Sequence, residues 1–394
     1  MIFPRQIEDK IQPWIHQKEI VVITGMRRVG KTTLLRKIFE SIESENKVFL
    51  DFENMLDRNV FREEDFNNIL KNLSSYGISN RSPVYIFIDE IQHQPETVNA
   101  IKYLYDHYGV KFFISGSSSF YLKNMFPESL SGRKVIFELF PLTFKEYLIF
   151  KRIKRNDNVS FSDKSNLKNK ISFEKLNKEF DEYLFFGGFP QVVLKESEEL
   201  KKGVLNDIFK SYYQKDIQLL ADFRNLRAFE ELVLLLMQRT GSKLDISKLA
   251  SAVSVSRETV YNYLSFLEGT YFIHLIRPYT TNVDREISGS RKVYICDTGL
   301  VNHFAKIDTG SLFENAVFNN LKQYGEIRYY QKRSRAEIDF VLPQKKMAIE
   351  AKTSGNEMDL KALRRTASAL KMNESYIVNR KFISDEGFVP ATEL

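Results

Sequence analysis

The stretch GMRRVGKTT, residues 25–33, decides the fold of this chain of 394 residues. It satisfies the pattern G-x-x-x-x-G-K-[ST], with an apolar run (residues 21–24) before it and a helical pattern from Lys31 after it. Glycines let backbone N–H groups wrap around phosphates, and the start of a helix favours negative charge. The stretch therefore predicts a phosphate-binding loop between a buried strand and a helix.

Three side chains of this loop have predicted roles toward ATP. We expect Lys31 to reach the β- and γ-phosphates, Thr32 to ligate Mg²⁺ and Thr33 to support the α-phosphate side. Arg27 and Arg28 leave three alternatives open: contact with the nucleotide, contact with a neighbouring subunit, or a solvated pair of charges. The predicted nucleotide-binding residues are Gly25, Met26, Arg27, Arg28, Val29, Gly30, Lys31, Thr32 and Thr33.

A pair of carboxylates follows a second apolar run in VYIFIDE. We expect Asp89 to hold the Mg²⁺ shell and Glu90 to polarise the attacking water, which makes both catalytic together with Lys31. A third run ends in ISGSSS, where Ser115 or Ser117 is a candidate to sense the γ-phosphate or orient the water. Serine and glycine after a strand are also ordinary turn residues, so that role stays open.

The apolar runs indicate the fold class. Residues 21–24, 84–88 and 111–115 are continuous rather than alternating, as in strands buried on both faces of a parallel sheet. Helical patterns alternate with them, which favours an α/β fold. The chain is long enough for two to four domains.

Composition gives weaker guidance. The net charge of +7 favours anionic partners such as nucleic acid. The single cysteine, Cys296, excludes an internal disulfide framework and a multi-cysteine zinc site. No apolar run approaches the roughly 20 residues of a membrane helix, and the first residues lack the features of a signal peptide. We therefore expect a cytoplasmic protein without membrane contact.

Several blocks occur in an order that resembles a known family. GMRRVGKTTLL, IFIDEIQ, ISGSSSFYL, LSGRKVIFELFPLTFKEYL and GGFP resemble the bacterial and archaeal AAA-type ATPases that carry a C-terminal domain of unknown function. The resemblance covers nearly the whole chain, and it equates the acids of the IFIDE block with Asp89 and Glu90. It also implies that Arg133, the arginine of LSGR, is an arginine finger or sensor, acting in cis or across a subunit boundary. A homo-oligomer is thus left open.

Two segments follow the ATPase blocks. Between residues 151 and 178 the chain is rich in Lys, Asn and Ser, which predicts a flexible insertion or an exposed linker. Its basic side chains are candidates to contact a phosphate backbone, but a charged segment that faces only water is the simpler interpretation. Residues 246–268 fit a helix-turn-helix in which Leu249 and Val253 face inward and Ser256 caps the second helix. The runs TYFIHLIRPY and RKVYICD would then form the wing of a winged helix.

The second helix of this module has a candidate reading face for DNA. A recognition helix contacts bases with its exposed side chains. Winged helices also dock proteins, so either kind of partner is open. The predicted DNA-binding residues are Arg257, Thr259, Tyr261 and Asn262.

The stretch AEIDFVLPQKKMAIEAK contains two β-like runs around a Pro-Gln-Lys-Lys turn. A two-residue hairpin loop would place Asp339 opposite Glu350 and Glu337 opposite Lys352, all on one face. Opposed Cβ atoms lie about 5 Å apart, so two carboxylates can share a divalent ion.

An acidic residue followed by E-x-K on the next strand resembles the core of the PD-(D/E)xK nuclease fold, in which Glu314 matches the common extra acid. The resemblance implies that Glu314, Asp339 and Glu350 hold Mg²⁺ and that Lys352 positions or activates the water attacking a phosphodiester. The alternative is an inactive nuclease-like fold, or charges that only form ion pairs.

Together these features predict an α/β chain: a P-loop NTPase (AAA-type) parallel sheet with a helical lid, a winged helix and a small nuclease-like domain. The first hypothesis is an ATP-hydrolysing protein whose C-terminal half binds DNA and is a candidate to cleave it. The second is a nucleotide-dependent switch or scaffold that docks protein without catalysis. A phosphotransferase fits the order of the blocks less well. The expected boundaries are 1–150 for the ATPase core, 151–240 for the insertion and lid, 241–305 for the winged helix and 306–394 for the nuclease-like domain.

Overall fold

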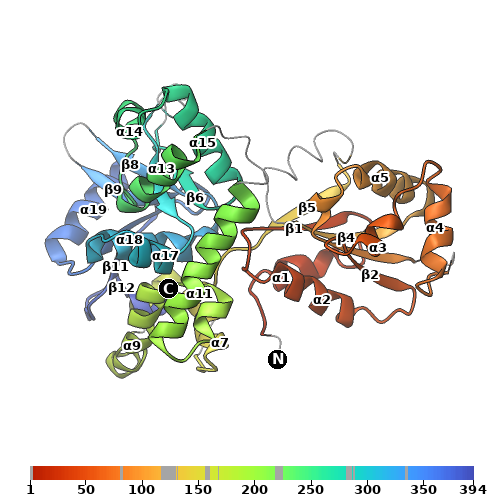
Figure 1. Cartoon of the computed structure of the whole chain (residues 1–394). Coiled ribbons are helices and arrows are strands. Elements are labelled where there is room, and N and C mark those ends of the chain that lie inside the picture. The colour runs from red at the N-terminus through yellow and green to blue at the C-terminus, as the bar shows by residue number, and fades with distance from the viewer. Residues whose placement is uncertain are drawn as a thin grey trace. The chain divides into compact units, whose positions relative to one another are not determined.

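The computed structural model describes residues 3–79, 83–116, 130, 132–155, 160–166, 168–217, 225–280, 286, 289–332 and 336–394. The chain divides into two compact units (Figure 1). Unit 1 comprises Met1–Phe140 together with Gly269–Tyr271, and unit 2 comprises Pro141–Glu268 together with Phe272–Leu394. Unit 1 therefore ends before the boundary at residue 150 that the sequence suggests.

Unit 1 contains a parallel sheet of five strands in the order β2–β3–β4–β1–β5. The strands are β1 (Ile20–Thr24), β2 (Lys47–Asp51), β3 (Tyr85–Asp89), β4 (Lys111–Gly116) and β5 (Lys134–Glu138). Every residue of β1, β3 and β4 is buried, which confirms that the continuous apolar runs are central strands. Because β4 lies between β1 and β3, the end of β4 separates the phosphate-binding loop from Asp89.

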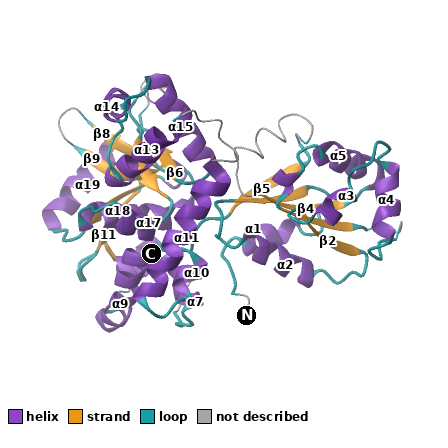
Figure 2. Ribbon diagram, viewed as in Figure 1, coloured by secondary structure: helices purple, strands orange, loops and turns teal. Residues whose placement is uncertain are grey.

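Helices flank this sheet (Figure 2). The longest, α2 and α5, bury apolar side chains such as Leu34, Leu35, Ile101 and Leu104. α2 begins directly after Gly30, whose φ of 100° favours glycine. The helical segments of unit 1 are α1 (Glu8–Ile11), η1 (Gln12–Trp14), α2 (Lys31–Ser41), α3 (Met55–Asn59), α4 (Asn67–Ser74), η2 (Ile91–His93) and α5 (Thr97–Tyr108).

Unit 2 begins with helices where the sequence suggests a flexible linker. Phe161 is buried and its ring contacts those of Tyr324 and Tyr376, and the Asn169 side chain caps α9. The linker prediction is therefore wrong for these residues, while 156–159 and 167 lie outside the described ranges. The helices of this part are α7 (Phe144–Phe150), α8 (Phe161–Asn166), α9 (Lys170–Phe186), α10 (Pro190–Val193), α11 (Glu198–Ser211) and η3 (Tyr212–Ile217).

The helix-turn-helix segment forms as expected within unit 2. It comprises α14 (Ile246–Ala252) and α15 (Arg257–Gly269), with α13 (Leu226–Gln238) before it and the antiparallel strands β6 (Ile273–Ile276) and β7 (Lys292–Ile295) after it. The Ser256 hydroxyl accepts a hydrogen bond from Thr259 N at 3.0 Å, so it caps α15. The two β-like runs thus pair as expected, and all four residues of β7 are buried. The role of this strand pair as a wing stays a prediction.

The C-terminal part of unit 2 is built on a mixed sheet in the order β12–β11–β10–β9–β8. The strands are β8 (Arg328–Gln331), β9 (Glu337–Leu342), β10 (Met347–Lys352), β11 (Glu374–Asn379) and β12 (Phe388–Pro390). The remaining helical segments are α17 (Thr298–Phe304), α18 (Thr309–Leu321), η4 (Lys322–Tyr324), η5 (Pro343–Lys345), α19 (Glu357–Ala369) and η6 (Ala391–Glu393).

The register of β9 against β10 is the predicted one, since Leu342 pairs with Met347 and Phe340 with Ile349. The connection differs: the 3₁₀ turn η5 and the left-handed Lys346 (φ 49°) replace a two-residue loop. The register of β8 against β9 shifts, so that Tyr329 faces both Asp339 and Phe340. Such bulges re-aim side chains and are frequent beside functional sites.

Candidate functional site

The phosphate-binding loop lies at the carboxyl ends of the parallel strands of unit 1. Lys31 is 4% exposed, and its Nζ donates hydrogen bonds of 3.0 Å to the carbonyl oxygens of Gly25 and Met26. A Cβ on Gly25 would lie 2.1 Å from the Leu139 carbonyl oxygen, and its φ is 152°, so the site accepts only glycine. The ammonium of Lys31 is thus held under the loop by neutral carbonyl groups.

Arg5 supports the same loop, although the sequence gives no signal for it. Arg5 is 8% exposed, and its guanidinium donates to the carbonyl oxygens of Val29 (2.8 Å) and Phe140 (2.7 Å). Glu8, three residues on, accepts from Arg5 N and pairs with Lys37 of α2 at 2.6 Å. The N-terminal segment therefore fixes the loop and the helix that follows it.

Asp89 ends β3 and is only 3% exposed. The Ser115 hydroxyl of β4 donates a hydrogen bond to Asp89 Oδ1. Burial raises the pKa of Asp89, and hydrogen bonds from Ser115 and Thr32 oppose that shift. Thr32 and Asp89 are hard oxygen donors on adjacent elements, so the residues present fit a magnesium ion bound together with phosphates.

Glu90 has a left-handed backbone, with a φ of 55°. Its N–H donates to the Ser115 hydroxyl at 3.3 Å, and its carboxylate accepts a hydrogen bond from the Gln92 side chain. Ser115 thus orients both acidic residues instead of facing the solvent, since it is fully buried. Ser117 lies outside the described residues.

Arg133 lies at the opposite edge of the sheet. Its carbonyl accepts from Ile20 N at the start of β1, and its guanidinium pairs with Asp106 of α5 at 2.8 Å and 3.2 Å. The phosphate-binding loop follows the other end of β1, and five strand residues span roughly 16 Å. The predicted action of Arg133 on phosphates of the same chain is therefore wrong in this arrangement, while a role across a subunit boundary stays a prediction.

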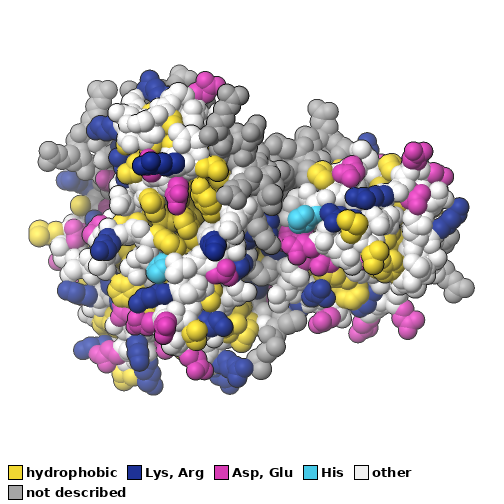
Figure 3. Space-filling model, viewed as in Figure 1, with side chains coloured by type: hydrophobic (Ala, Val, Ile, Leu, Met, Phe, Trp, Pro, Cys, Tyr) yellow, Lys and Arg dark blue, Asp and Glu magenta, His cyan; other side chains and the backbone are white. Residues whose placement is uncertain are grey.

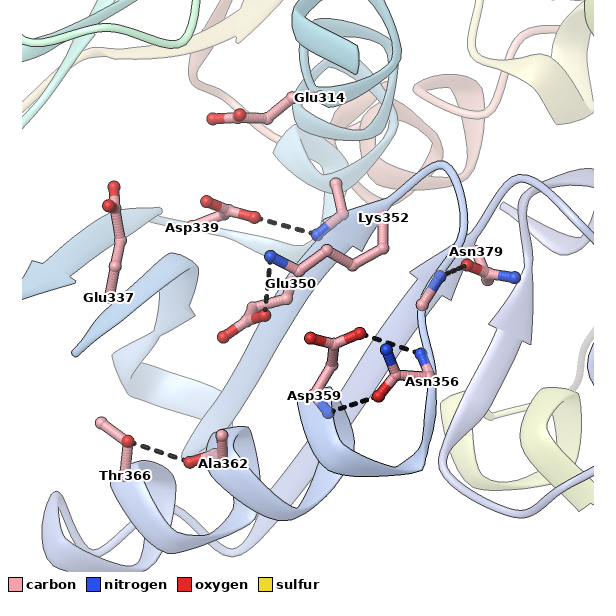
Figure 4. Close-up of polar contacts among 12 residues, drawn as sticks. Glu314, Glu337, Asp339, Glu350, Lys352, Asn356, Asp359, Ala362, Thr366 and Asn379 are labelled. Atoms are coloured by element: carbon pink, nitrogen blue, oxygen red, sulfur yellow. Dashed lines mark hydrogen bonds and ion pairs between the residues drawn. The ribbon is translucent and has the colours of Figure 1, made fainter. Parts of the chain in front are cut away.

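The predicted nuclease residues converge on the sheet of unit 2 (Figure 4). Ala351 N donates to Asp339 Oδ2 at 3.0 Å, which places Asp339 beside the Glu350–Lys352 stretch. Lys352 pairs with Glu350 of its own strand at 3.3 Å. The pairs between β9 and β10 run from Leu342–Met347 to Phe340–Ile349, so the positions of Asp339 opposite Glu350 and of Glu337 opposite Lys352 stay predictions. On its other side Glu337 pairs in register with Gln331 of β8.

A second lysine, which the sequence analysis missed, lies among these acids. Lys292 of β7 has a 5% exposed side chain, and its Nζ lies 2.8 Å from Glu337 Oε1, 3.5 Å from Glu314 Oε1 and 3.7 Å from Asp339 Oδ1. The Tyr294 hydroxyl donates to the same Glu314 oxygen at 2.6 Å. The available signal was a lysine two residues before a tyrosine in an apolar run, which puts both on one face of a strand.

Burial and charge shift the pKa values of this cluster. Burial raises the pKa of Glu314 to about 7, and the charge of Asp339 adds to the shift. Burial likewise raises the pKa of Glu350 to about 7, against the effect of Lys352. Burial alone would lower the pKa of Lys292, but Glu314 and Asp339 outweigh it and the pKa is raised. The neighbouring acids therefore favour the protonated form of Lys292.

The acidic cluster does not fit a divalent ion. Within the described ranges, no group of three or more His, Cys, Asp or Glu side chains is arranged to hold a metal. Glu314 and Asp339 face the Lys292 ammonium, and Glu350 faces Lys352. The three predicted metal ligands, Glu314, Asp339 and Glu350, are thus each paired with a lysine ammonium.

The predicted DNA-binding residues lie on α15. Arg257, Tyr261 and Asn262 are exposed, whereas Thr259 is half-buried and its hydroxyl contacts Ser256 at 2.8 Å. Glu258 is also exposed on this helix. Figure 3 shows Lys and Arg side chains interspersed with Asp and Glu over the face in view. Three of the four residues can therefore reach a partner, and the exposed Glu258 beside Arg257 carries the opposite charge.

Three family descriptions match successive parts of the chain. Residues 17–148 match the AAA domain, residues 177–311 match a domain of unknown function (DUF8612) and residues 309–386 match a further domain of unknown function (DUF4143). The AAA match covers the phosphate-binding loop, Asp89 and Glu90, and it implies nucleotide binding.

The "Uncharacterized protein MJ1544" of Methanocaldococcus jannaschii is 30% identical over 410 residues, covering 99% of this chain and 87% of that protein. This chain belongs to the same family. An "Uncharacterized protein" of Haemophilus influenzae, 28% identical over 350 residues, covers 85% of this chain and 82% of its own length.

Solved structures are more distant. The Walker-type ATPase PABY2304 of Pyrococcus abyssi superposes with a TM-score of 0.48 and 14% identity, over 77% of this chain and 96% of its own. The ORC1 protein of Aeropyrum pernix, solved in complex with DNA, superposes with a TM-score of 0.32 and 13% identity, over 82% and 95% of the two chains. Both likenesses are too low to carry an argument. Separately, none of the helices in the described ranges has the length and apolar character needed to cross a membrane.

Proposed function

We propose that this chain binds ATP with Mg²⁺ and hydrolyses it at the carboxyl edge of the unit 1 sheet. The observation that supports this most directly is the buried contact of Asp89 with Ser115, next to Thr32 and under the loop that holds Lys31. A carboxylate buried at a strand end costs free energy unless it has a ligand or donors. A metal ion bound together with a triphosphate would be such a ligand for Asp89.

Each residue has a separate part in the proposed reaction. Lys31 exchanges its two carbonyl partners for β- and γ-phosphate oxygens, and Thr32 and Asp89 hold the metal ion. When bound, Mg²⁺ neutralises charge that develops on the phosphates. Glu90 accepts a proton from the attacking water, and Ser115 fixes the relative positions of Glu90 and Asp89.

The ATP site is tested with Lys31→Ala, Glu90→Gln and the control Lys71→Ala, which removes an exposed lysine of α4. We expect Lys31→Ala to abolish tight ATP binding, and Glu90→Gln to keep binding but lower turnover by about 10²–10⁴-fold. Lys71→Ala should behave as wild type in calorimetry and phosphate-release assays. Normal turnover in Lys31→Ala would refute the site, and undiminished turnover in Glu90→Gln would show that another residue activates the water.

The proposal extends to the C-terminal half, which we expect to bind duplex DNA through α15. Its support is the exposure of Arg257, Tyr261 and Asn262 on the second helix of a helix-turn-helix. Arg257→Ala combined with Asn262→Ala should weaken binding at least about tenfold in fluorescence anisotropy. Lys248→Ala, on the preceding helix, is the matched control. Equal affinity of the double variant and the control would remove α15 as the DNA-binding element.

A second candidate is a nucleotide-dependent switch whose C-terminal half docks protein without catalysis. One observation favours it: Lys292 lies among the acids of the nuclease-like pattern. A chain that binds no duplex DNA but changes its protease sensitivity between ADP and a non-hydrolysable ATP analogue would support this candidate over the first.

A further inference from the structure

The acidic cluster of unit 2 is organised around the Lys292 ammonium. Glu337 and Asp339 come from β9 and Glu314 comes from α18, and each has one oxygen directed at Lys292 Nζ. An ammonium has three N–H donors, so it can serve three acceptors at once. The 2.8 Å contact with Glu337 has the length of a charge-assisted hydrogen bond.

The spacing of the three carboxylates suits an ammonium and not a divalent metal ion. Their oxygens lie 2.8–3.7 Å from Lys292 Nζ. Mg²⁺ and Ca²⁺ hold oxygen ligands at about 2.0–2.6 Å. The carboxylates would all have to move inward, and Lys292 would have to leave, before a metal could be bound between them.

The other polar contacts of the cluster fix the carboxylates in this arrangement. Tyr294 donates to the Glu314 oxygen that faces Lys292, and Ala351 N donates to the second oxygen of Asp339. Glu350, the remaining acid, is paired with Lys352. Each acid is therefore already engaged by a donor from the protein.

The strand that carries Lys292 explains why it stays in place. Lys292 and Tyr294 alternate along β7, so both point to the side of Glu314, and all four β7 residues are buried. A buried ammonium is stable only when it is paired, and withdrawing Lys292 would remove the cation that contacts all three carboxyl groups. Lys292 is thus part of the fold and not a mobile surface side chain.

We propose that Lys292 permanently occupies the cation position of this cluster, so that the C-terminal sheet works without a divalent metal ion at Glu314, Asp339 and Glu350. The disagreement between the nuclease-like sequence pattern and the arrangement of the side chains is the basis for this conclusion. It implies that metal-dependent cleavage of a phosphodiester is not the activity of this domain.

Manganese titration of the nucleotide-free chain, followed by electron paramagnetic resonance, tests the inference. An Asp89→Asn background removes the predicted metal ligand of unit 1, so the outcome does not depend on the ATP proposal. We expect no saturable site in this background. Adding Lys292→Ala should create one Mn²⁺ site per chain, at least tenfold tighter than any residual binding, and adding Asp339→Asn should remove it again.

Two results would overturn the inference. The first is a saturable Mn²⁺ site in the Asp89→Asn chain that disappears with Asp339→Asn, a measurement that leaves Lys292 intact. The second is a Lys292→Ala chain that is folded by circular dichroism but gains no Mn²⁺ site. Lys292→Gln, which keeps the length of the side chain and an N–H donor, replaces Lys292→Ala in the experiment if the alanine variant is unfolded.

Discussion

Two buried lysines, one in each unit, differ in what holds them. Lys31 and Lys292 are each 4% exposed. The ammonium of Lys31 binds two backbone carbonyl oxygens of its own loop. The ammonium of Lys292 lies among three carboxylates from a neighbouring strand and helix. The ammonium of Lys31 is therefore hydrogen-bonded to carbonyl groups, whereas the ammonium of Lys292 is paired with carboxyl groups.

The difference in partners predicts a difference in function. A carbonyl group is neutral, so Lys31 can exchange it for phosphate oxygens at little cost. Moving Lys292 away would cost free energy, because the carboxyl groups around it would lose the cation that pairs with them. We therefore expect Lys292 to stay in its position. We infer that the site of unit 1 awaits an anionic ligand, whereas the cation position of unit 2 is filled by the protein itself.

The largest expected effect is on the free energy of unfolding of unit 2 when the Lys292 side chain is removed. Lys292→Ala leaves the half-buried Glu314, Glu337 and Asp339 without the Lys292 ammonium and should destabilise unit 2 by at most about 3–5 kcal/mol, since Glu337 is 38% exposed and water screens part of its charge. Urea unfolding followed by circular dichroism measures the loss. The control is Lys248→Ala, since that lysine is exposed and its pairing with Asp245 at 3.8 Å contributes about 1 kcal/mol or less. Equal losses in both variants would mean that Lys292 is not an essential counter-charge.

The two clusters also differ in how far the sequence predicts them. The elements of the unit 1 site are local: a strand, a turn and a helix within a few residues, with Asp89 at the end of another apolar run, so the motif indicates both partners. The roles of Lys292 and Arg5 cannot be predicted from local sequence motifs, because each side chain contacts a segment that is distant in the sequence. Lys292 contacts β9 and α18 across a long sequence separation, and Arg5 reaches Phe140.

The C-terminal sheet shows the same limit within one hairpin. The register between β9 and β10 follows from the apolar alternation and is predicted correctly. The bulge opposite Tyr329 and the buried position of β7 depend on β8 and α18, which the hairpin sequence does not contain. The hairpin sequence therefore predicts only which residues lie opposite one another and does not indicate the ion pair of Glu337 with Lys292.

The next effect concerns the open site of unit 1. Ser115→Ala removes the donor to Asp89 and the acceptor for Glu90 N. Removing a group that orients a metal ligand typically lowers the metal affinity by about 10–100-fold. The Mg²⁺ concentration for half-maximal ATP turnover should therefore rise by about 10–100-fold in Ser115→Ala. Steady-state kinetics with varied Mg²⁺ measures it. Ser75→Ala, at an exposed position after α4, should leave the requirement unchanged, and an unchanged requirement in Ser115→Ala would contradict the positioning role.

A smaller effect is expected near the filled site, where His274 lies opposite Tyr294 on β6. Burial lowers the pKa of His274 well below its usual value of 6.5, and the charge of Lys322 adds to the shift. On acidification the unfolded chain binds a proton that the folded chain does not, so stability falls below about pH 6.5, by at most about 1.4 kcal/mol per pH unit. His274→Gln should flatten this part of the profile in urea unfolding between pH 7 and 5. An unchanged slope would show that His274 is protonated in the fold.

The smallest effect is expected at the far edge of the unit 1 sheet. Arg133 lies directly before β5, away from the phosphate-binding loop, and it pairs with the exposed Asp106 of α5. Arg133→Ala should therefore leave the ATP affinity of the chain within about twofold of wild type in isothermal titration calorimetry. A loss of more than tenfold would mean that this arginine reaches the nucleotide after all.

The number of Mn²⁺ ions bound per chain, in the presence of a saturating non-hydrolysable ATP analogue, tests the contrast between the two sites most directly. One open and one filled cation position predict a single Mn²⁺ ion, which is lost in Asp89→Asn and retained in Asp339→Asn. Two ions in the wild-type chain, one of them lost in Asp339→Asn, would contradict the account.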